Sequence, residues 1–283
     1  MNNAKLIGGG RIRQVRGHSS DMPLFSIITV VYNGVAHLEK TILSVLNQTY
    51  LNIEYIIIDG GSTDGTLDVI RRYDSQINYW VSEPDRGIYD AMNKGIALAT
   101  GEVIGLLNAG DVYLEGSIAN LARNVNQKSS IYYGDFYIYY PDLNIQRLVI
   151  ANMHGLRYHM SICHQALFVS RTIYAQYGLY NLDYQLAADY DLISTCYRNH
   201  VTFQKLNMPV VCFFNGGASD QNAILYKREC LQIAFKRHIP MSDLFKMLKK
   251  SFIEILLNKT YWAIQQMIGT KKAATLRQKW QNG

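Results

Sequence analysis

The stretch from Asp59 to Asp111 constrains the fold of this chain more than any other part of the sequence. An apolar run over residues 55–58 stops at Asp59, in a turn rich in Gly, Ser, Thr and Asp, and a second apolar run over residues 103–107 stops just before Asn108. Strands that end in carboxylates and glycines, within an alternating strand and helix pattern, gather polar groups at the carboxyl edge of a sheet. Open α/β folds bind ligands at that edge. The sequence therefore predicts a ligand site there.

The hydrophobic pattern around this stretch alternates between strand and helix. β-branched or apolar runs predict strands over residues 25–31, 54–58, 78–82 and 103–107, and helical spacing predicts helices over 37–47, 66–73 and 89–99. Further strands are predicted over 131–140, 166–170 and 210–214, with a helix over 190–198. This order predicts an α/β fold with a mainly parallel central sheet and helices on both faces.

The pattern also suggests three regions. Residues 1–22 lack periodicity and are expected to be a flexible leader, residues 23–220 form the α/β domain, and residues 221–283 are expected to be helical. A chain of 283 residues with 48% hydrophobic and 18% charged residues is typical of a globular protein with a substantial core. The four cysteines form no CxxC pair, which predicts reduced thiols in a cytosolic protein. No apolar run reaches the length of about 18 residues that a spanning helix needs.

Charge is distributed unevenly along the chain. The whole sequence carries +6, residues 1–21 carry +3 and residues 236–283 carry +8, which leaves −5 for the part between them. An acidic middle suits a domain that holds a divalent cation. No segment has the interleaved aromatic and basic strands of a nucleic-acid module, so nucleic acid is not an expected partner.

The basic C-terminal region has apolar residues at helical spacing among lysines, together with Trp262. Such helices suit the surface of an anionic bilayer, and we expect a peripheral protein on the inner, cytoplasmic face of the membrane. Packing against the α/β domain or against a second copy in a homo-oligomer is the alternative interpretation.

Five motifs occur in an order and spacing that point to a known family. They are FSIITVVYN, DGGSTDGT, PDRGIYDAMNKGI, LLNAGD and AADYDL, and they span residues 23–220. In this set the chain resembles the family 2 glycosyltransferases with the GT-A fold, and within them the bacterial colanic acid and O-antigen polysaccharide transferases. The resemblance implies metal-dependent, inverting transfer of a sugar from a UDP-hexose or UDP-N-acetylhexosamine. The implied acceptor is a hydroxyl of a lipid-linked oligosaccharide in surface polysaccharide biosynthesis.

The resemblance also implies how the nucleotide is held. The carboxylate of Asp59 would accept the uracil N3–H, and Thr29 and Tyr32 would line the base pocket. Capping of the next helix is the competing role for Asp59, but Ser62 or Asp64 suits that role better. A solvated, salt-bridged loop is the competing role for Arg86. The implied donor-binding set is Thr29, Tyr32, Asp59, Gly60, Ser62, Asp85, Arg86, Asn93, Asn108 and His164.

The metal-binding motif of the family corresponds to residues 108–111. Mg²⁺ and Mn²⁺ are hard cations that require oxygen ligands, and a cation on the diphosphate would neutralise charge on the leaving group. The resemblance assigns this cation to Asp111. Asn108 and Gly110 stand where the family usually has further carboxylates, so weak metal affinity is expected in the absence of the donor.

The proton of the acceptor hydroxyl needs a base, and the resemblance assigns that role to Asp189 at the head of a predicted helix. A helix N-terminus favours the ionised carboxylate that a base requires. Ala188 stands where the family often has Glu, so Asp189 is alone in the role, and Asp191 is expected to be structural. His164 precedes a strand and is expected to contact the diphosphate or the acceptor.

Two other kinds of function stay open. One is a nucleotidyltransferase, but its glycine-rich GxG(T/S)xxRxxP opening is missing from the sequence. The other is a sugar-nucleotide-binding protein that has lost turnover, which the thinned acidic motifs suggest. A dinucleotide-dependent dehydrogenase would need GxGxxG after the first strand, where the chain has Tyr32-Asn33-Gly34 instead.

Overall fold

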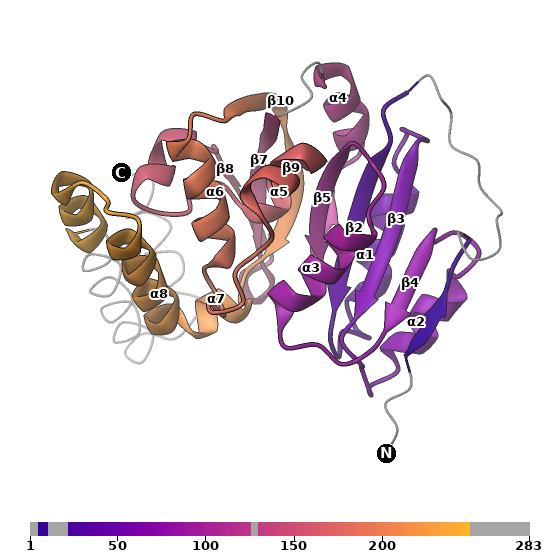
Figure 1. Cartoon of the computed structure of the whole chain (residues 1–283). Coiled ribbons are helices and arrows are strands. Elements are labelled where there is room, and N and C mark those ends of the chain that lie inside the picture. Colours follow the sequence, from indigo (N-terminus) through magenta and orange to yellow (C-terminus); the bar gives the residue numbers. More distant parts are fainter. Residues whose placement is uncertain (1–4, 11–21, 126–129, 250–283) are drawn as a thin grey trace.

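The computed structural model describes residues 5–10, 22–125 and 130–249. In this part of the chain, strands join into one mixed sheet with helices on both sides, as Figure 1 shows. The strand order across the sheet is β1-β4-β3-β2-β5-β9-β7-β10-β6, and β8 pairs with β7. The strands are β1 (Leu6–Gly8), β2 (Phe25–Val31), β3 (Ile53–Asp59), β4 (Tyr79–Ser82), β5 (Val103–Asn108), β6 (Val112–Tyr113), β7 (Ser130–Tyr140), β8 (Ile145–Val149), β9 (Leu167–Ser170) and β10 (Thr202–Phe214).

The first half of the sheet is parallel, as the sequence predicts. β2 lies between β3 and β5 and runs parallel to both, and β3 is parallel to β4. All seven residues of β2 are buried, because helices cover both faces of a parallel sheet. The helices of this half are α1 (Leu38–Leu46), α2 (Thr66–Arg72) and α3 (Ile88–Leu98).

The second half of the sheet is mixed. β9 pairs antiparallel with both β5 and β7, whereas β10 runs parallel to β7. Its helices are α4 (Ser117–Asn124), α5 (Arg171–Tyr177), α6 (Ala188–Arg198), α7 (Ala218–Gln221) and α8 (Ala223–Lys236), and residues 241–249 are also helical. Three short 3₁₀ turns complete the set: η1 (Pro141–Leu143), η2 (Met153–Arg157) and η3 (His164–Ala166).

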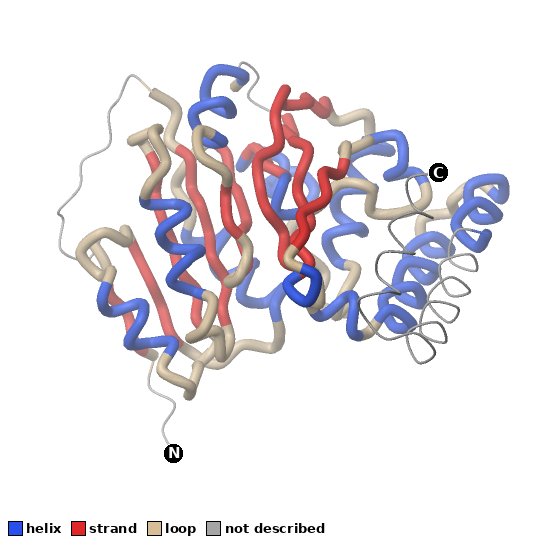
Figure 2. Tube along the Cα trace, turned by 180° about the vertical axis from the view of Figure 1, so that it is seen from behind, coloured by secondary structure: helices blue, strands red, loops and turns tan. Residues whose placement is uncertain are grey.

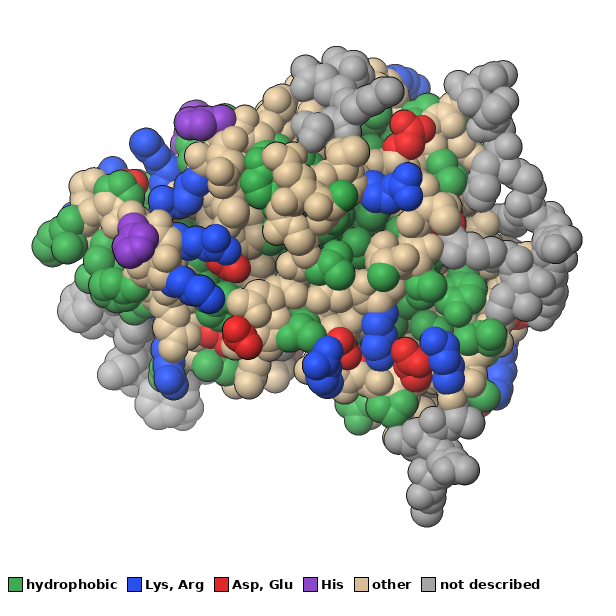
Figure 3. Space-filling view, viewed as in Figure 1, with side chains coloured by type: hydrophobic (Ala, Val, Ile, Leu, Met, Phe, Trp, Pro, Cys, Tyr) green, Lys and Arg blue, Asp and Glu red, His purple; other side chains and the backbone are tan. Residues whose placement is uncertain are grey.

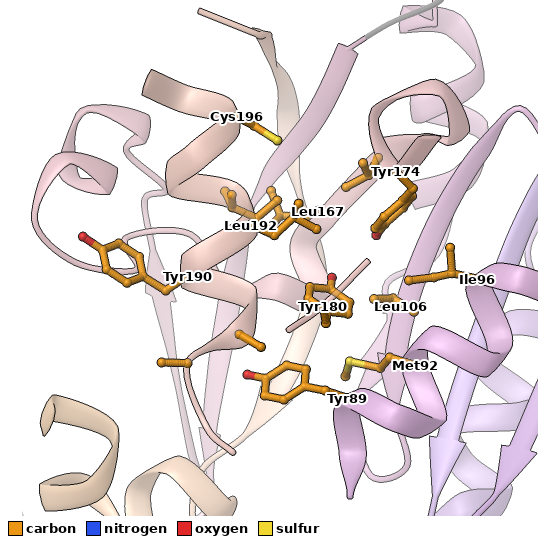
Figure 4. Packing of buried hydrophobic residues seen from close by; sticks show 14 of the residues in the cluster. Tyr89, Met92, Ile96, Leu106, Leu167, Tyr174, Tyr180, Tyr190, Leu192 and Cys196 are labelled. Atoms are coloured by element: carbon orange, nitrogen blue, oxygen red, sulfur yellow. The ribbon is translucent and has the colours of Figure 1, made fainter. Parts of the chain in front are cut away.

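Two hydrophobic clusters lie on opposite faces of the sheet. One packs α1, α2 and α4 against their face, which Figure 2 shows from behind, and the other packs α3, α5, α6 and α8 against the opposite face. Figure 4 shows Tyr89 and Met92 of α3 facing Tyr180 and the start of α6. The Tyr89 and Tyr180 rings lie 5.3 Å apart between centroids. This packing fixes the start of α6 against α3, beside the carboxyl edge of the parallel strands.

The structure adds contacts at the two boundaries predicted from the sequence. The predicted leader contains β1, which pairs with β4 at the edge of the sheet, and the Gly9 amide donates to Asp74. After the boundary predicted at residue 220 the described chain is helical in α8, and Cys230 and Ile233 of α8 belong to the core that contains α6. The predicted helices beyond residue 249 lie outside the described residues.

Candidate active site

Two adjoining cavities lie at the carboxyl edge of the sheet. The larger has a volume of about 740 Å³ and the smaller about 480 Å³, both within the range of small-molecule sites. Ile88, Asn108, Phe213 and Gly217 line both cavities, so the two form one continuous site. The register of the parallel strands sets Asn108 of β5 beside Val30 of β2, which brings the ends of the strands to this edge.

One end of the larger cavity is lined by Tyr32, which follows β2, and by Asp85, which follows β4. Tyr32 and Asp85 approach Gly60 so closely that a Cβ on Gly60 would clash with the Asp85 carboxylate and touch the Tyr32 ring. Tyr32 is 66% exposed and offers an open ring face at the cavity wall. The Asp85 Oδ1 accepts a hydrogen bond from the Gly87 amide at 2.9 Å. Gly60 therefore lets an aromatic ring and a carboxylate converge at one point.

Asp59 is fully buried and does not line either cavity. Its Oδ2 accepts hydrogen bonds from the Ser62 amide at 3.1 Å and the Ser82 hydroxyl at 2.5 Å, and its Oδ1 accepts from the Ser62 hydroxyl. Ser62 in turn accepts a hydrogen bond from the Asn33 amide at 2.7 Å. The structure thus gives Asp59 and Ser62 the task of holding the turn between β3, β4 and the end of β2.

Three other predicted donor residues lie away from the cavities. The Thr29 hydroxyl is buried in the core, 3.0 Å from the Tyr55 hydroxyl. Asn93 makes two hydrogen bonds to the main chain of Tyr180, at 2.8 and 2.9 Å, and so ties α3 to the segment before α6. Arg86 forms a salt bridge with Asp90 at 3.0 Å, and the Arg86 side chain is 76% exposed. A solvated salt bridge of this kind is the alternative to a donor contact that the sequence analysis named for Arg86.

Asp111 lies in the wall of the larger cavity and is only 4% exposed. Its Oδ2 accepts a hydrogen bond from Gln165 Nε2 at 2.7 Å, and its Oδ1 accepts from the Phe214 amide at 2.9 Å. Burial raises the pKa of Asp111 to about 7, against the opposing effect of these two hydrogen bonds. Asn108 Oδ1 is buried and has no hydrogen-bond partner among the described residues.

Asp189 and His164 lie together in the wall of the smaller cavity. The Asp189 Oδ1 accepts hydrogen bonds from the Tyr89 hydroxyl at 3.0 Å and from the Tyr190 amide at 2.8 Å, and its Oδ2 lies 3.5 Å from His164 Nδ1. Burial lowers the pKa of His164, although the nearby Asp189 opposes that shift. Both side chains are mostly buried, at 18% exposure for His164 and 11% for Asp189.

Three residues that the sequence did not single out for these tasks support the site. Gln165 is 1% exposed and holds Asp111, and Tyr89 holds Asp189. Glu229 of α8 accepts hydrogen bonds from the amides of Gln185, Leu186 and Ala187, just before α6 begins. Gln165 could have been found from the sequence because it is next to His164. The role of Glu229 could not, because its hydrogen bonds join residues more than 40 positions apart.

Asp191, which the sequence analysis expects to be structural, forms an ion pair within the fold. Its carboxylate accepts two hydrogen bonds from the Arg237 guanidinium, at 2.9 and 3.1 Å, which ties α6 to the end of α8. Asp189 and Asp191 therefore have separate surroundings although they are two residues apart.

The sequence is similar to those of known glycosyltransferases. The model of the glycosyl transferase family 2 matches residues 26–181. The chain is 32% identical over 226 residues to a PGL/p-HBAD biosynthesis glycosyltransferase of Mycobacterium bovis (strain BCG / Pasteur 1173P2), which covers 78% of this chain and 85% of that protein. A protein of the same description from Mycobacterium tuberculosis (strain ATCC 25177 / H37Ra) matches to the same extent.

Solved structures share the fold at low sequence identity. S. aureus TarS 1-349 in complex with UDP-GlcNAc matches with a TM-score of 0.62 and 16% identity, covering 74% of this chain and 64% of that one. The mannosyltransferase PcManGT from Pyrobaculum calidifontis, in complex with GDP-Man and Mn²⁺, matches with a TM-score of 0.60 and 16% identity, covering 92% of this chain and 80% of that one.

The chain belongs to glycosyl transferase family 2 and has the GT-A fold. It is a glycosyltransferase that uses a nucleotide-sugar donor, and enzymes of this family invert the anomeric configuration. Family membership sets aside the nucleotidyltransferase alternative. Among the described residues, none of the helices has the length and apolar character needed to cross a membrane.

Proposed function

We propose that this transferase moves a sugar from a UDP-hexose or UDP-N-acetylhexosamine to a hydroxyl of a lipid-linked oligosaccharide in bacterial surface polysaccharide biosynthesis. The observation that carries the proposal is the pair of adjoining cavities that meet at Asn108. The larger would hold the nucleotide and its diphosphate. The smaller, with Asp189 in its wall, would hold the acceptor. A sugar lying across the junction would have its anomeric carbon between the leaving group and the base.

Tyr32 and Asp85 are the residues that we assign to the base of the nucleotide. An exposed aromatic ring can stack on uracil, and a carboxylate can accept its N3–H. Asp59 is expected to support this contact indirectly, because its oxygens already accept hydrogen bonds from Ser62 and Ser82. We therefore assign to Asp85, which lies against Gly60, the role that the resemblance gave to Asp59.

Replacement of Asp85 tests this assignment. Asp85→Asn presents an amide where uracil offers N3–H, so UDP affinity should fall by roughly 10-fold, the cost of one charge-assisted hydrogen bond. Calorimetric titration with UDP measures this loss. Asp68→Asn is a matched control, because Asp68 is an exposed carboxylate on α2 that pairs with Arg71 outside the cavities. Equal UDP affinity in Asp85→Asn and the wild type would contradict the assignment.

A divalent cation fits the larger cavity. None of the described residues that line it is Lys or Arg, so a diphosphate there would lack a protein cation. Asp111 has a carboxylate with spare lone pairs, and the Asn108 Oδ1 nearby along the chain is buried without a partner. No group of three or more His, Cys, Asp or Glu in the described ranges could hold a metal by itself. Two protein oxygens suit Mg²⁺ or Mn²⁺ when the diphosphate and water supply the rest.

The proposed transfer is a single displacement. The acceptor hydroxyl attacks the anomeric carbon as its proton passes to the base provided by Asp189, and the bond from that carbon to the diphosphate oxygen breaks with its electron pair. When bound, the cation would supply charge neutralisation for the departing diphosphate. Asp189 is suited to the base role because Tyr89 and the start of α6 fix its carboxylate in the cavity wall.

A membrane surface is the second partner that we propose. The end of the molecule formed by α8 and residues 241–249 has exposed apolar side chains at Phe235, Met241, Phe245 and Leu248, and Lys236 and Lys249 lie among them in sequence. Figure 3 shows hydrophobic and basic side chains side by side at this end. Exposed apolar side chains with lysines beside them suit the cytoplasmic face of an anionic membrane, where a lipid-linked acceptor would be held.

Substitution of Phe245 tests the membrane contact. Phe245 is 67% exposed, so Phe245→Glu should leave the fold intact while it places a carboxylate against anionic lipid. Sedimentation with vesicles of phosphatidylglycerol and phosphatidylcholine should show at least a roughly 10-fold loss of binding, and binding of the wild type should fall at high salt. Leu51→Glu is the control, since Leu51 is 85% exposed in the loop before β3. Equal loss in both variants, or no loss in either, would contradict the contact.

A further inference from the structure

The two oxygens of Asp189 differ in what surrounds them. The Oδ1 atom accepts two hydrogen bonds, from the Tyr89 hydroxyl and the Tyr190 amide. The Oδ2 atom lies 3.5 Å from His164 Nδ1, and no hydrogen bond to it is formed in the described part of the chain. Catalytic hydrogen bonds are often this long before the substrate binds. The Asp189 oxygen that accepts no hydrogen bond, Oδ2, therefore lies beside the imidazole.

The two nitrogens of His164 also differ. Nδ1 faces Asp189, whereas Nε2 is buried and has no hydrogen-bond partner among the described residues. A buried polar atom without a partner destabilises the fold, and such atoms in native proteins are often functional. His164 also lines the smaller cavity and has the more exposed side chain of the pair. A donor from the acceptor substrate would complete the hydrogen bonding of Nε2.

The tautomer follows from the partner of Nδ1. A carboxylate oxygen only accepts hydrogen bonds, so its position beside Nδ1 favours the tautomer in which Nδ1 carries the hydrogen and Nε2 keeps its lone pair. Burial lowers the pKa of His164, which favours the neutral ring. A neutral imidazole with a free Nε2 lone pair is the form that accepts a proton.

We propose that His164 and Asp189 act as a pair, in which Asp189 holds the Nδ1–H tautomer and His164 Nε2 takes the proton of the acceptor hydroxyl. The inference rests on the proposed function and changes the route of its proton. The acceptor oxygen bonds to the anomeric carbon, the diphosphate leaves with the electron pair of the broken bond, and the proton stays on the imidazolium beside the Asp189 carboxylate. The imidazolium then releases its proton to water.

The tautomer can be measured without turnover. Long-range ¹H–¹⁵N spectra of the full chain labelled with [¹⁵N]histidine distinguish a protonated ring nitrogen from one with a lone pair, and His164→Asn identifies the His164 signals among the seven histidines. At pH 7.5 we expect the Nδ1–H tautomer. Asp189→Asn, whose amide can donate toward Nδ1, should shift His164 toward the Nε2–H tautomer. A wild-type ring that is already Nε2–H, or an imidazolium at this pH, would overturn the proposal.

Kinetics test the proton route. In His164→Asn the amide nitrogen can still reach Asp189 from the Nδ1 position, but no basic nitrogen is left at the Nε2 position. UDP release from UDP-glucose and UDP-N-acetylglucosamine, with octyl glucoside as the model acceptor, should therefore fall by roughly 10²–10⁴ in His164→Asn, while calorimetric UDP affinity is kept. The His164→Asn/Asp189→Asn double variant should be no slower than the slower single variant, because residues that act as a unit are not additive.

The outcomes separate this inference from the proposed function. Near wild-type turnover in His164→Asn, with Asp189→Asn inactive, would mean that Asp189 takes the proton directly, which overturns the pair and keeps the transferase. Multiplied losses in the double variant would also overturn it. If the wild type binds UDP but consumes neither donor, the proposed donor class fails, and the tautomer measurement still decides the pairing.

Discussion

Replacement of Asp189 by Asn should lower sugar transfer by roughly 10²–10⁴ and leave nucleotide binding unchanged. The amide keeps the size of the side chain and can still accept the Tyr89 hydrogen bond, but it cannot act as a base. The loss is expected whether Asp189 takes the proton itself or through His164, since both routes need the carboxylate. Initial rates of transfer, with UDP affinity measured on the same samples, give the comparison.

Asp191→Asn is the matched control for this experiment. Asp191 is two residues away on the same helix, and its carboxylate binds Arg237 rather than a cavity. Removing one partner of this ion pair should lower the melting temperature and change transfer much less than Asp189→Asn does. If Asp191→Asn abolished transfer while Asp189→Asn had little effect, the base would be misassigned.

The second large effect is expected at Asp111. Asp111→Asn removes the carboxylate that would hold the cation on the diphosphate, and turnover should fall by on the order of 10²–10³, as for other lost electrostatic contacts to a developing charge. Excess chelator should silence the wild type to a similar extent. Full activity of the wild type in excess chelator would contradict the metal assignment.

The pH dependence of folding stability should reveal the raised pKa of Asp111 without any measurement of turnover. Burial raises the pKa of this carboxyl from 3.8 to about 7, so between these values the folded chain binds a proton that the unfolded chain has released. Wild-type stability should therefore fall as the pH rises through this interval, whereas Asp111→Asn has no such group to titrate. The melting temperature of the variant relative to the wild type should rise from pH 5 to pH 8. Parallel pH curves for the two proteins would show that Asp111 titrates normally.

Much of the fold could be predicted because its signals are local. The β-branched run over residues 25–31 and the helical spacing over 89–99 correspond closely to β2 and α3. β1 was missed because its three residues have no periodic pattern of their own and depend on pairing with β4. The contact of the C-terminal region with the domain was open in the sequence for a similar reason. The packing of α8 on α6 is decided by side chains such as Glu229 that act far from their place in sequence.

The site shows the same division between local and distant signals. The turn after β3 and the motif at residues 108–111 lie at the carboxyl edge of the sheet, as strand ends predict. The sequence around Asp59 could not indicate that the Ser82 hydroxyl, on the next strand, donates a hydrogen bond to the Asp59 carboxylate, because that contact spans 23 residues. Nor could it indicate that the Thr29 hydroxyl faces Tyr55 in the core. Several polar side chains lie at the strand ends, and contacts between strands decide which of them faces the ligand. Those contacts cannot be read from a single sequence.

The central claim is that this chain transfers a sugar from a UDP-sugar with inversion. Its most direct test is to incubate the purified protein and Mn²⁺ with UDP-hexoses and UDP-N-acetylhexosamines and octyl glucoside, and to follow UDP release and the anomeric configuration of the product by NMR. We expect at least one α-linked UDP-sugar to yield UDP and a β-glycoside. Binding of UDP without consumption of any donor would instead indicate a sugar-nucleotide-binding protein, and an α-glycoside product would contradict the single displacement.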